Sequence, residues 1–143
     1  MENVQIVAYH ENGFSVMPDA NDESLRNKEV AVGINPLLRY KEGTNAVGCQ
    51  LRVEYSVDGK TLMEYSAVLT VMMDGWAGFL KKDTDDSAKI AATREAWRAV
   101  LGFVRGAICA NATNHRNTLV ARMILPVVNL DNFMQTVSIS KVE

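Results

Sequence analysis

The sequence predicts an α+β domain in which a four-stranded antiparallel sheet is packed on one face by a long interrupted helix. Two observations lead to this prediction. Apolar and polar residues alternate in strand-like segments between about residues 4 and 73, and apolar residues recur at helical spacing from about residue 84. Strands followed by helices usually place the helices on one face of the sheet. No repeat or linker divides the chain, so residues 1–143 are expected to form one domain.

Two strands are expected before the main hairpin. Residues 4–9 form the first, which continues past a short break into residues 14–17. The polar and acidic stretch 18–27 is typical of a loop. Residues 30–36 alternate again, and residues 37–40 extend this strand along a sheet edge, where a proline is tolerated. We expect simple connections between successive strands.

The clearest element is a hairpin whose apolar residues occupy odd positions from 47 to 57 and again from 63 to 73. This is the period-two pattern of half-buried strands. A two-residue turn would place the two apolar rows on opposite faces, whereas a three-residue loop at 57–59 keeps them on one face. The longer loop also sets Arg52 opposite Glu64, a favourable cross-strand pair. We therefore expect the three-residue loop.

The second strand of the hairpin also carries apolar residues on its polar face, at Leu62, Val68 and Met72. Two explanations stay open at this point. Either this part of the sheet is covered on both faces, or its apolar surface is exposed and used for binding.

The helix is expected to begin after the acidic residues 83–86, which supply N-cap candidates and a negative charge for the helix start. An apolar stripe then faces the sheet. Gly102 and Gly106 indicate a bend or a close backbone contact within the helix. The stripe consists of Ile90, Trp97, Val100, Leu101, Val104 and Ile108.

Composition excludes several classes of protein. The net charge of −2 disfavours an electrostatic nucleic-acid binder, and no apolar run is long enough to span a membrane. The N-terminus lacks the pattern of a secretory signal, so a cytoplasmic location and reduced cysteines are expected. Cys49 and Cys109 have no metal-ligand spacing. We expect no metal and no cofactor.

No catalytic arrangement is recognisable in the sequence. Cys109 could be paired with His115 as a nucleophile, but Cys109 directly follows Ile108 in an apolar helix. It is therefore expected to be a small buried hydrophobic residue. Phosphate-binding loops and nucleophile-elbow motifs do not occur. We expect a protein that is not an enzyme.

Two segments of the second half resemble the SecB export chaperones. Phe103-Val104-Arg105 matches the aromatic-x-Arg of that family, and Gly102 stands where the family usually has a helix-breaking proline. Residues 125–130, Leu-Pro-Val-Val-Asn-Leu, match the closing motif of the family with one extra valine. The resemblance implies a sheet-plus-helix subunit that dimerises and forms tetramers, with apolar grooves for unfolded polypeptide.

The resemblance, together with position at strand ends or outside clean core periodicity, selects candidates for a peptide-binding groove. They are Phe14, Val16, Leu37, Leu38, Tyr40, Trp76, Phe79, Phe133 and Met134. The expected function is that of an ATP-independent holdase for non-native polypeptides, with protein export as the process that the resemblance implies. The alternative is a small α+β module that binds one dedicated protein partner or a small ligand. An open groove would favour the holdase. A closed cavity of ligand size would favour a module that binds a small ligand.

Two differences from the family weigh against the Sec translocation motor as a partner. The family's zinc-binding tail needs C-terminal cysteines, and none follows Cys109. The acidic motor-contact position of the family falls on Ser66. Holding of clients is therefore a better-supported expectation than delivery to the motor.

A band of mostly small residues on the side of the helix away from the stripe predicts a homodimer or homotetramer. Small residues let a second helix approach closely, and the resemblance implies helix packing between dimers. The alternative is a solvent-facing helix that is rich in alanine because of its helix propensity. The predicted interface residues are Ala96, Ala99, Phe103 and Ala107.

Overall fold

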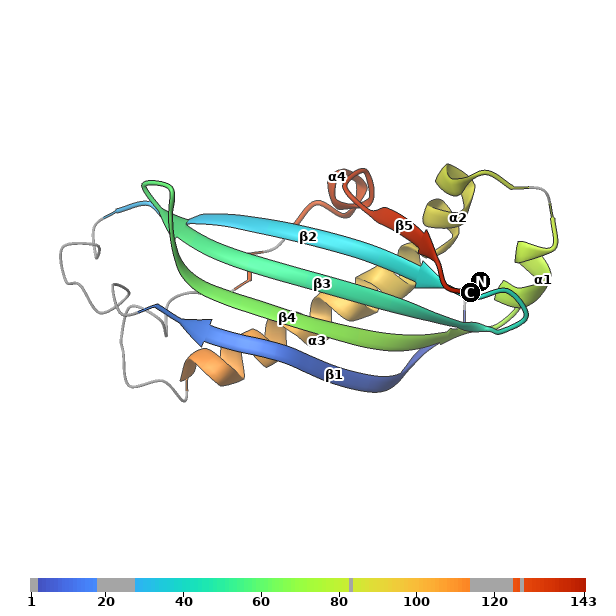
Figure 1. Cartoon of the computed structure of the whole chain (residues 1–143), viewed down its shortest axis with the longest axis horizontal. Coiled ribbons are helices and arrows are strands. Elements are labelled where there is room, and N and C mark those ends of the chain that lie inside the picture. The colour runs from blue at the N-terminus through green and yellow to red at the C-terminus, as the bar shows by residue number, and fades with distance from the viewer. Residues whose placement is uncertain (1–2, 18–27, 83, 114–124, 127) are drawn as a thin grey trace.

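The computed structural model describes residues 3–17, 28–82, 84–113, 125–126 and 128–143 (Figure 1). It confirms the α+β class: helices pack against one face of an elongated, twisted sheet. The strands are β1 (Val4–Val16), β2 (Ala31–Tyr40), β3 (Ala46–Val57), β4 (Lys60–Met73) and β5 (Ser138–Lys141). The helices are α1 (Trp76–Leu80), α2 (Asp86–Ala92), α3 (Arg94–Thr113) and α4 (Leu130–Met134). No helix among these residues is long and apolar enough to cross a membrane.

The sheet has one strand more than the predicted four, and its order is β1-β4-β3-β2-β5. The expected simple connectivity is wrong, because β1 pairs with β4 and not with β2. The additional strand β5 lies parallel to β2, with Leu37 opposite Ser138 and Tyr40 opposite Lys141. All other neighbouring strands are antiparallel.

The hairpin of β3 and β4 keeps both apolar rows on one face, but by a different device from the expected three-residue loop. Val57 pairs with Lys60 across a two-residue turn, in which Asp58 and Gly59 have φ values of 52° and 80°. Such left-handed pairs suit the twist of a hairpin. The register then shifts at Leu62, the extra residue of a β-bulge, so that apolar rows meet on one face beyond it.

Arg52 consequently lies opposite Ser66 rather than opposite Glu64. The predicted ion pair nevertheless forms diagonally, with Arg52 Nη2 at 3.0 Å from Glu64 Oε1. The same guanidinium nitrogen lies 2.6 Å from Glu54 Oε1. The prediction of the partner was right and the prediction of the register was wrong.

The helical region is interrupted at Thr93 and not at Gly102. Asp85 caps α2, its Oδ1 accepting from the Ala88 backbone N–H at 2.8 Å. Thr93 is buried, and its hydroxyl donates to the Ile90 carbonyl at 2.7 Å, at the junction between α2 and α3. Helix α3 then runs without a break through Gly102 and Gly106. In the described part of the chain, a Cβ at either glycine would meet no other element within 4 Å, so the expected close contact is absent there.

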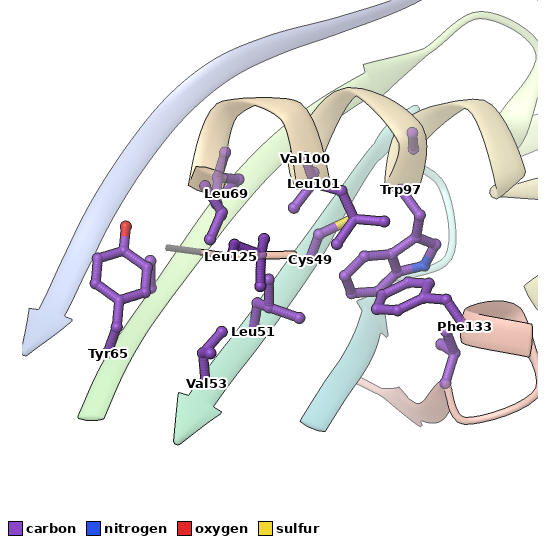
Figure 2. Packing of buried hydrophobic residues seen from close by; sticks show 14 of the residues in the cluster. Cys49, Leu51, Val53, Tyr65, Leu69, Trp97, Val100, Leu101, Leu125 and Phe133 are labelled. Atoms are coloured by element: carbon purple, nitrogen blue, oxygen red, sulfur yellow. The ribbon is translucent and has the colours of Figure 1, made fainter. Parts of the chain in front are cut away.

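The core lies between α3 and the face of the sheet that it covers (Figure 2). The predicted stripe is confirmed from Trp97 to Ile108, all of its members being buried there, while Ile90 on α2 is half-buried. Trp97 meets the ring of Phe133 edge-on, with the ring centroids 5.4 Å apart. Leu125 also points into this cluster, so the segment after α3 completes the core.

Candidate functional site

Four of the nine predicted groove residues are buried inside the subunit, although one of them, Tyr40, still forms part of the wall of an open hollow on the sheet. Trp76 and Phe133 are buried because α1 and α4 extend the core beyond the sheet, whereas Leu38 lies on the inward face of β2. Tyr40 meets Trp76 edge-on, and Trp76 stacks on Phe79 with 5.6 Å between ring centroids. The four buried residues are Leu38, Tyr40, Trp76 and Phe133.

The other five predicted groove residues are half-buried, but the structure does not bring them together. Phe14 and Val16 lie at the end of β1, and Phe79 lies on α1 at the opposite end of the sheet (Figure 1). Leu37 neighbours the inward-facing Leu38 on β2, so it faces the other side of the sheet. Met134 lies on α4.

Met134 lines an open apolar hollow between α2 and α4, which we call the α2–α4 hollow. Its volume is about 390 Å³. Ile90 belongs to the predicted helix stripe, while Ala91 and Val137 are not among the predicted groove residues. The sequence shows that these three residues are apolar. They line one hollow only because the helical region breaks at Thr93 and because the closing segment passes beside α2. The lining residues are Ser87, Ile90, Ala91, Met134, Gln135 and Val137.

A second hollow, of about 370 Å³, opens on the sheet face away from α3, around Gly48. Val68 forms part of its wall and is half-buried, whereas Met72 is 38% exposed and Leu62 is buried beside its bulge. The three apolar residues therefore differ in how far they are covered. Leu62 is covered, and Met72 contributes exposed apolar surface.

Helix α3 presents exposed apolar surface beside β1. Phe103 is 39% exposed and packs on Tyr9, with ring centroids 4.8 Å apart. Of the predicted interface residues, Ala96 is fully buried within the subunit, so its side chain cannot contact another copy. Ala99 and Ala107 are half-buried. Phe103, Gly106 and Ala110 of the band are exposed, and Gly102 and Cys109 are exposed beside them.

The two sequence motifs of the second half meet in space. Arg105 donates from Nε to the Leu125 carbonyl and from Nη2 to the Pro126 carbonyl, both at 3.2 Å. The asparagine of the closing motif, Asn129, caps α4 by accepting from the Asn132 backbone N–H at 3.2 Å. Residue 127 of the same motif lies outside the described residues. The arginine thus holds the closing segment against α3, and the asparagine starts the helix that carries Met134.

The described residues offer little for catalysis. Burial raises the pKa of Cys49 to about 12, so its thiol stays protonated at neutral pH. Cys109 is exposed, which corrects the expected burial, because it lies one position past the buried Ile108. His10 is exposed on β1, and His115 lies outside the described residues. No three metal-ligating side chains gather in the part of the chain that the structure describes.

The fold is similar to that of a solved protein. The Mycobacterium tuberculosis Rv1957 SecB-like chaperone, in complex with a ChAD peptide from the Rv1956 HigA1 antitoxin, superposes with a TM-score of 0.59. The match covers 87% of this chain and 90% of that chain, at 8% sequence identity. The fold is SecB-like. No family model and no curated protein matches the sequence.

Some apolar residues near the end of β1 and the start of β2 are also only partly covered. These side chains pack against the core and remain half-exposed. The end of β1 and the start of β2 lie at the same end of the sheet, with β4 and β3 between the two strands (Figure 1). These residues are Phe14, Val16, Val30, Val32 and Ile34.

Proposed function

We propose that this chain is an ATP-independent chaperone that binds segments of non-native polypeptide through apolar surface. One observation carries the proposal: the similar structure is that of a SecB-like chaperone, and it holds a peptide. The likeness extends over nearly the whole of both chains, so the complete architecture is shared. The proposal includes no enzymatic activity, and client release would follow from folding of the client or transfer to another protein.

The shape of the apolar surface supports a polypeptide ligand over an enclosed small molecule. Both hollows are open to solvent, and each has a volume near the lower end of the range for ligand pockets. A space of about 390 Å³ in the α2–α4 hollow accommodates a few apolar side chains. The flexible thioether of Met134 can adjust to side chains of different shape.

A second candidate is a chaperone or binding module with one dedicated protein partner. The similar structure favours it, since the peptide bound there comes from one named antitoxin. A dedicated chaperone would bind one partner tightly and protect unrelated unfolded proteins poorly. We propose a cytoplasmic location for either candidate, and delivery to the Sec translocation motor is not part of the proposal.

Suppression of aggregation tests the proposed function. Equimolar chain is expected to reduce light scattering by a chemically unfolded model protein after dilution. Met134→Lys should weaken this protection several-fold, because it places a charge in the α2–α4 hollow. Asn132→Lys is the matched control, since Asn132 is exposed on the same helix and outside the hollow. Absence of protection by the unmodified chain, or equal protection by both variants, would contradict the proposal.

We also propose that α3 joins copies of the chain into a homodimer or homotetramer. Gly102 and Gly106 are exposed within a helix, where each glycine costs about 1 kcal/mol relative to alanine. No contact among the described residues of the subunit requires their small size. A second helix packed closely on this face would require residues as small as glycine.

Light scattering at micromolar concentration measures this assembly directly. Gly106→Glu is expected to lower the molecular mass to that of a smaller assembly while the circular dichroism spectrum stays unchanged. Gly78→Glu is the matched control, because Gly78 is also exposed in a helix with no neighbour within 4 Å. A monomeric mass for the unmodified chain would rule out the assembly.

A further inference from the structure

Within the described part of the chain, residues 31–36 of β2 have no strand neighbour on their outer side. β5 pairs with Leu37–Tyr40 only, while β3 pairs along the whole of β2 on the inner side. Among the residues that the structure describes, none pairs with residues 31–36 on the side opposite β3. The open stretch lies directly in line with β5.

The backbone groups that face this open side can be identified. Tyr40 directs its carbonyl outward, where it accepts from the Val142 N–H at 2.7 Å. In an antiparallel pair, alternate residues direct both backbone groups toward the partner strand or away from it. The register of β2 with β3 has no irregularity, so Val32 and Ile34 direct their N–H and C=O groups outward as Tyr40 does.

Pro36 supports this assignment. It belongs to the same alternate row as Ile34 and Tyr40, and a proline has no N–H to donate. Within a sheet, proline is tolerated where the missing N–H would face away from the neighbouring strand. The β2–β3 ladder therefore loses no hydrogen bond at Pro36.

The side chains beside the open edge suit an apolar extended segment. Val32 and Ile34 are half-buried on the face that contacts the core, opposite Tyr55 and Val53. β5 shows which pattern this position accepts, since Ile139 lies beside the buried Leu38 and the two serines and the lysine are exposed. An occupant with apolar residues at alternate positions would repeat that pattern.

We propose that a client polypeptide binds as an added β-strand along Val32 and Ile34, in line with β5. This inference rests on the proposed function and specifies how the client is held. The client's backbone pairs with the outward N–H and C=O groups, and its alternate apolar side chains cover Val32 and Ile34. Main-chain pairing is independent of sequence, so such an edge accepts many segments that are extended, apolar at alternate positions and free of proline.

Binding of a defined peptide tests the added strand. The probe is a fluorescent nine-residue peptide with lysine at both ends and alternating valine and threonine between them. Ile34→Pro removes one outward N–H and leaves the β3 ladder intact, as Pro36 already does. It is expected to weaken binding about tenfold by fluorescence anisotropy. Ile34→Val keeps the backbone donor and should stay within about twofold of the unmodified chain.

A second measurement uses the unmodified protein, so it does not depend on the folding of the proline variant. N-methylation of one alternating set of peptide amides should abolish binding, and methylation of the other set should leave it within about twofold. Equal effects of the two sets would overturn the added strand.

Two further outcomes separate this inference from the proposed function. Suppression of aggregation combined with equal binding of all methylated peptides would refute the added strand and leave the chaperone function standing. A loss of self-association in Ile34→Pro, with peptide binding unchanged, would assign the edge to a second copy of the chain and also overturn the inference. Failure to suppress aggregation would count against both.

Discussion

Replacing Trp97 with alanine is expected to lower the free energy of unfolding by about 3–5 kcal/mol, the usual loss for a large buried aromatic residue. Trp97 is fully buried and packs edge-on against Phe133 of α4. The variant therefore removes the aromatic packing between α3 and the helix that carries Met134, while the ion pair between Arg94 and Asp131 still joins the two helices. Urea denaturation followed by circular dichroism measures the loss.

Phe103→Ala is the matched control for this experiment. Phe103 is an aromatic residue of the same helix, but it is 39% exposed. Its removal should therefore cost less than that of Trp97, about 1–2 kcal/mol in the isolated subunit, because only its packing on Tyr9 is lost. Equal losses in the two variants would contradict the described position of α3. Trp97→Phe should retain part of the packing and fall between the two.

Alkaline pH is expected to unfold the protein, because one buried cysteine thiol and two buried tyrosine hydroxyls lose their protons. Burial raises the pKa of Cys49 from 9.0 to about 12 and that of Tyr55 from 10.0 to about 12. Burial and the hydrogen bond to Tyr9 raise the pKa of Tyr65 well above its usual range. In each case the unfolded chain loses its proton at a lower pH than the folded chain.

The direction of the pH effect follows from these shifts. Above pH 9 the unfolded state binds fewer protons than the folded state, so stability falls as pH rises. Each group contributes a fall of about 1.4 kcal/mol per pH unit between its unfolded and folded pKa. The combined loss between pH 9 and pH 12 should reach roughly 5 kcal/mol or more, which is comparable with the whole stability of many domains. Urea denaturation at a series of pH values measures it.

Tyr55→Phe isolates one of these contributions. The variant should unfold at a higher pH than the unmodified chain, because one buried proton no longer has to be lost. At pH 8 it should be at least as stable, since Tyr55 Oη is buried without a partner in the described part of the chain. An unchanged alkaline midpoint would show that Tyr55 ionises freely in the folded state.

The strands and the helix stripe could be predicted because each repeats a local pattern. Alternation along β3 and β4 identifies the buried row directly. The bulge at Leu62 could not be predicted, because a three-residue loop and a two-residue turn with a bulge both keep the apolar rows on one face. Strand β5 is only four residues long, too short for its pattern to indicate a partner.

The candidate site was harder to predict, because it depends on how short segments close over the core. Trp76 and Phe133 lie outside the periodic elements, which made them look available for a ligand. In the structure α1 and α4 turn them inward against Tyr40 and Trp97. Ile90 shows the converse: it belongs to the helical stripe, yet the break at Thr93 leaves it lining a hollow.

The pairing of β1 with β4 has a consequence for the order of events during synthesis. Val16 pairs with Met63, and Val4 pairs with Met73. On a ribosome that adds about 5–20 residues per second, β1 therefore emerges several seconds before the strand that pairs with it. During that interval its apolar residues, Phe14 and Val16 among them, have no native partner strand. During its own synthesis, this proposed holdase thus carries in β1 an exposed apolar segment of the kind that a chaperone protects.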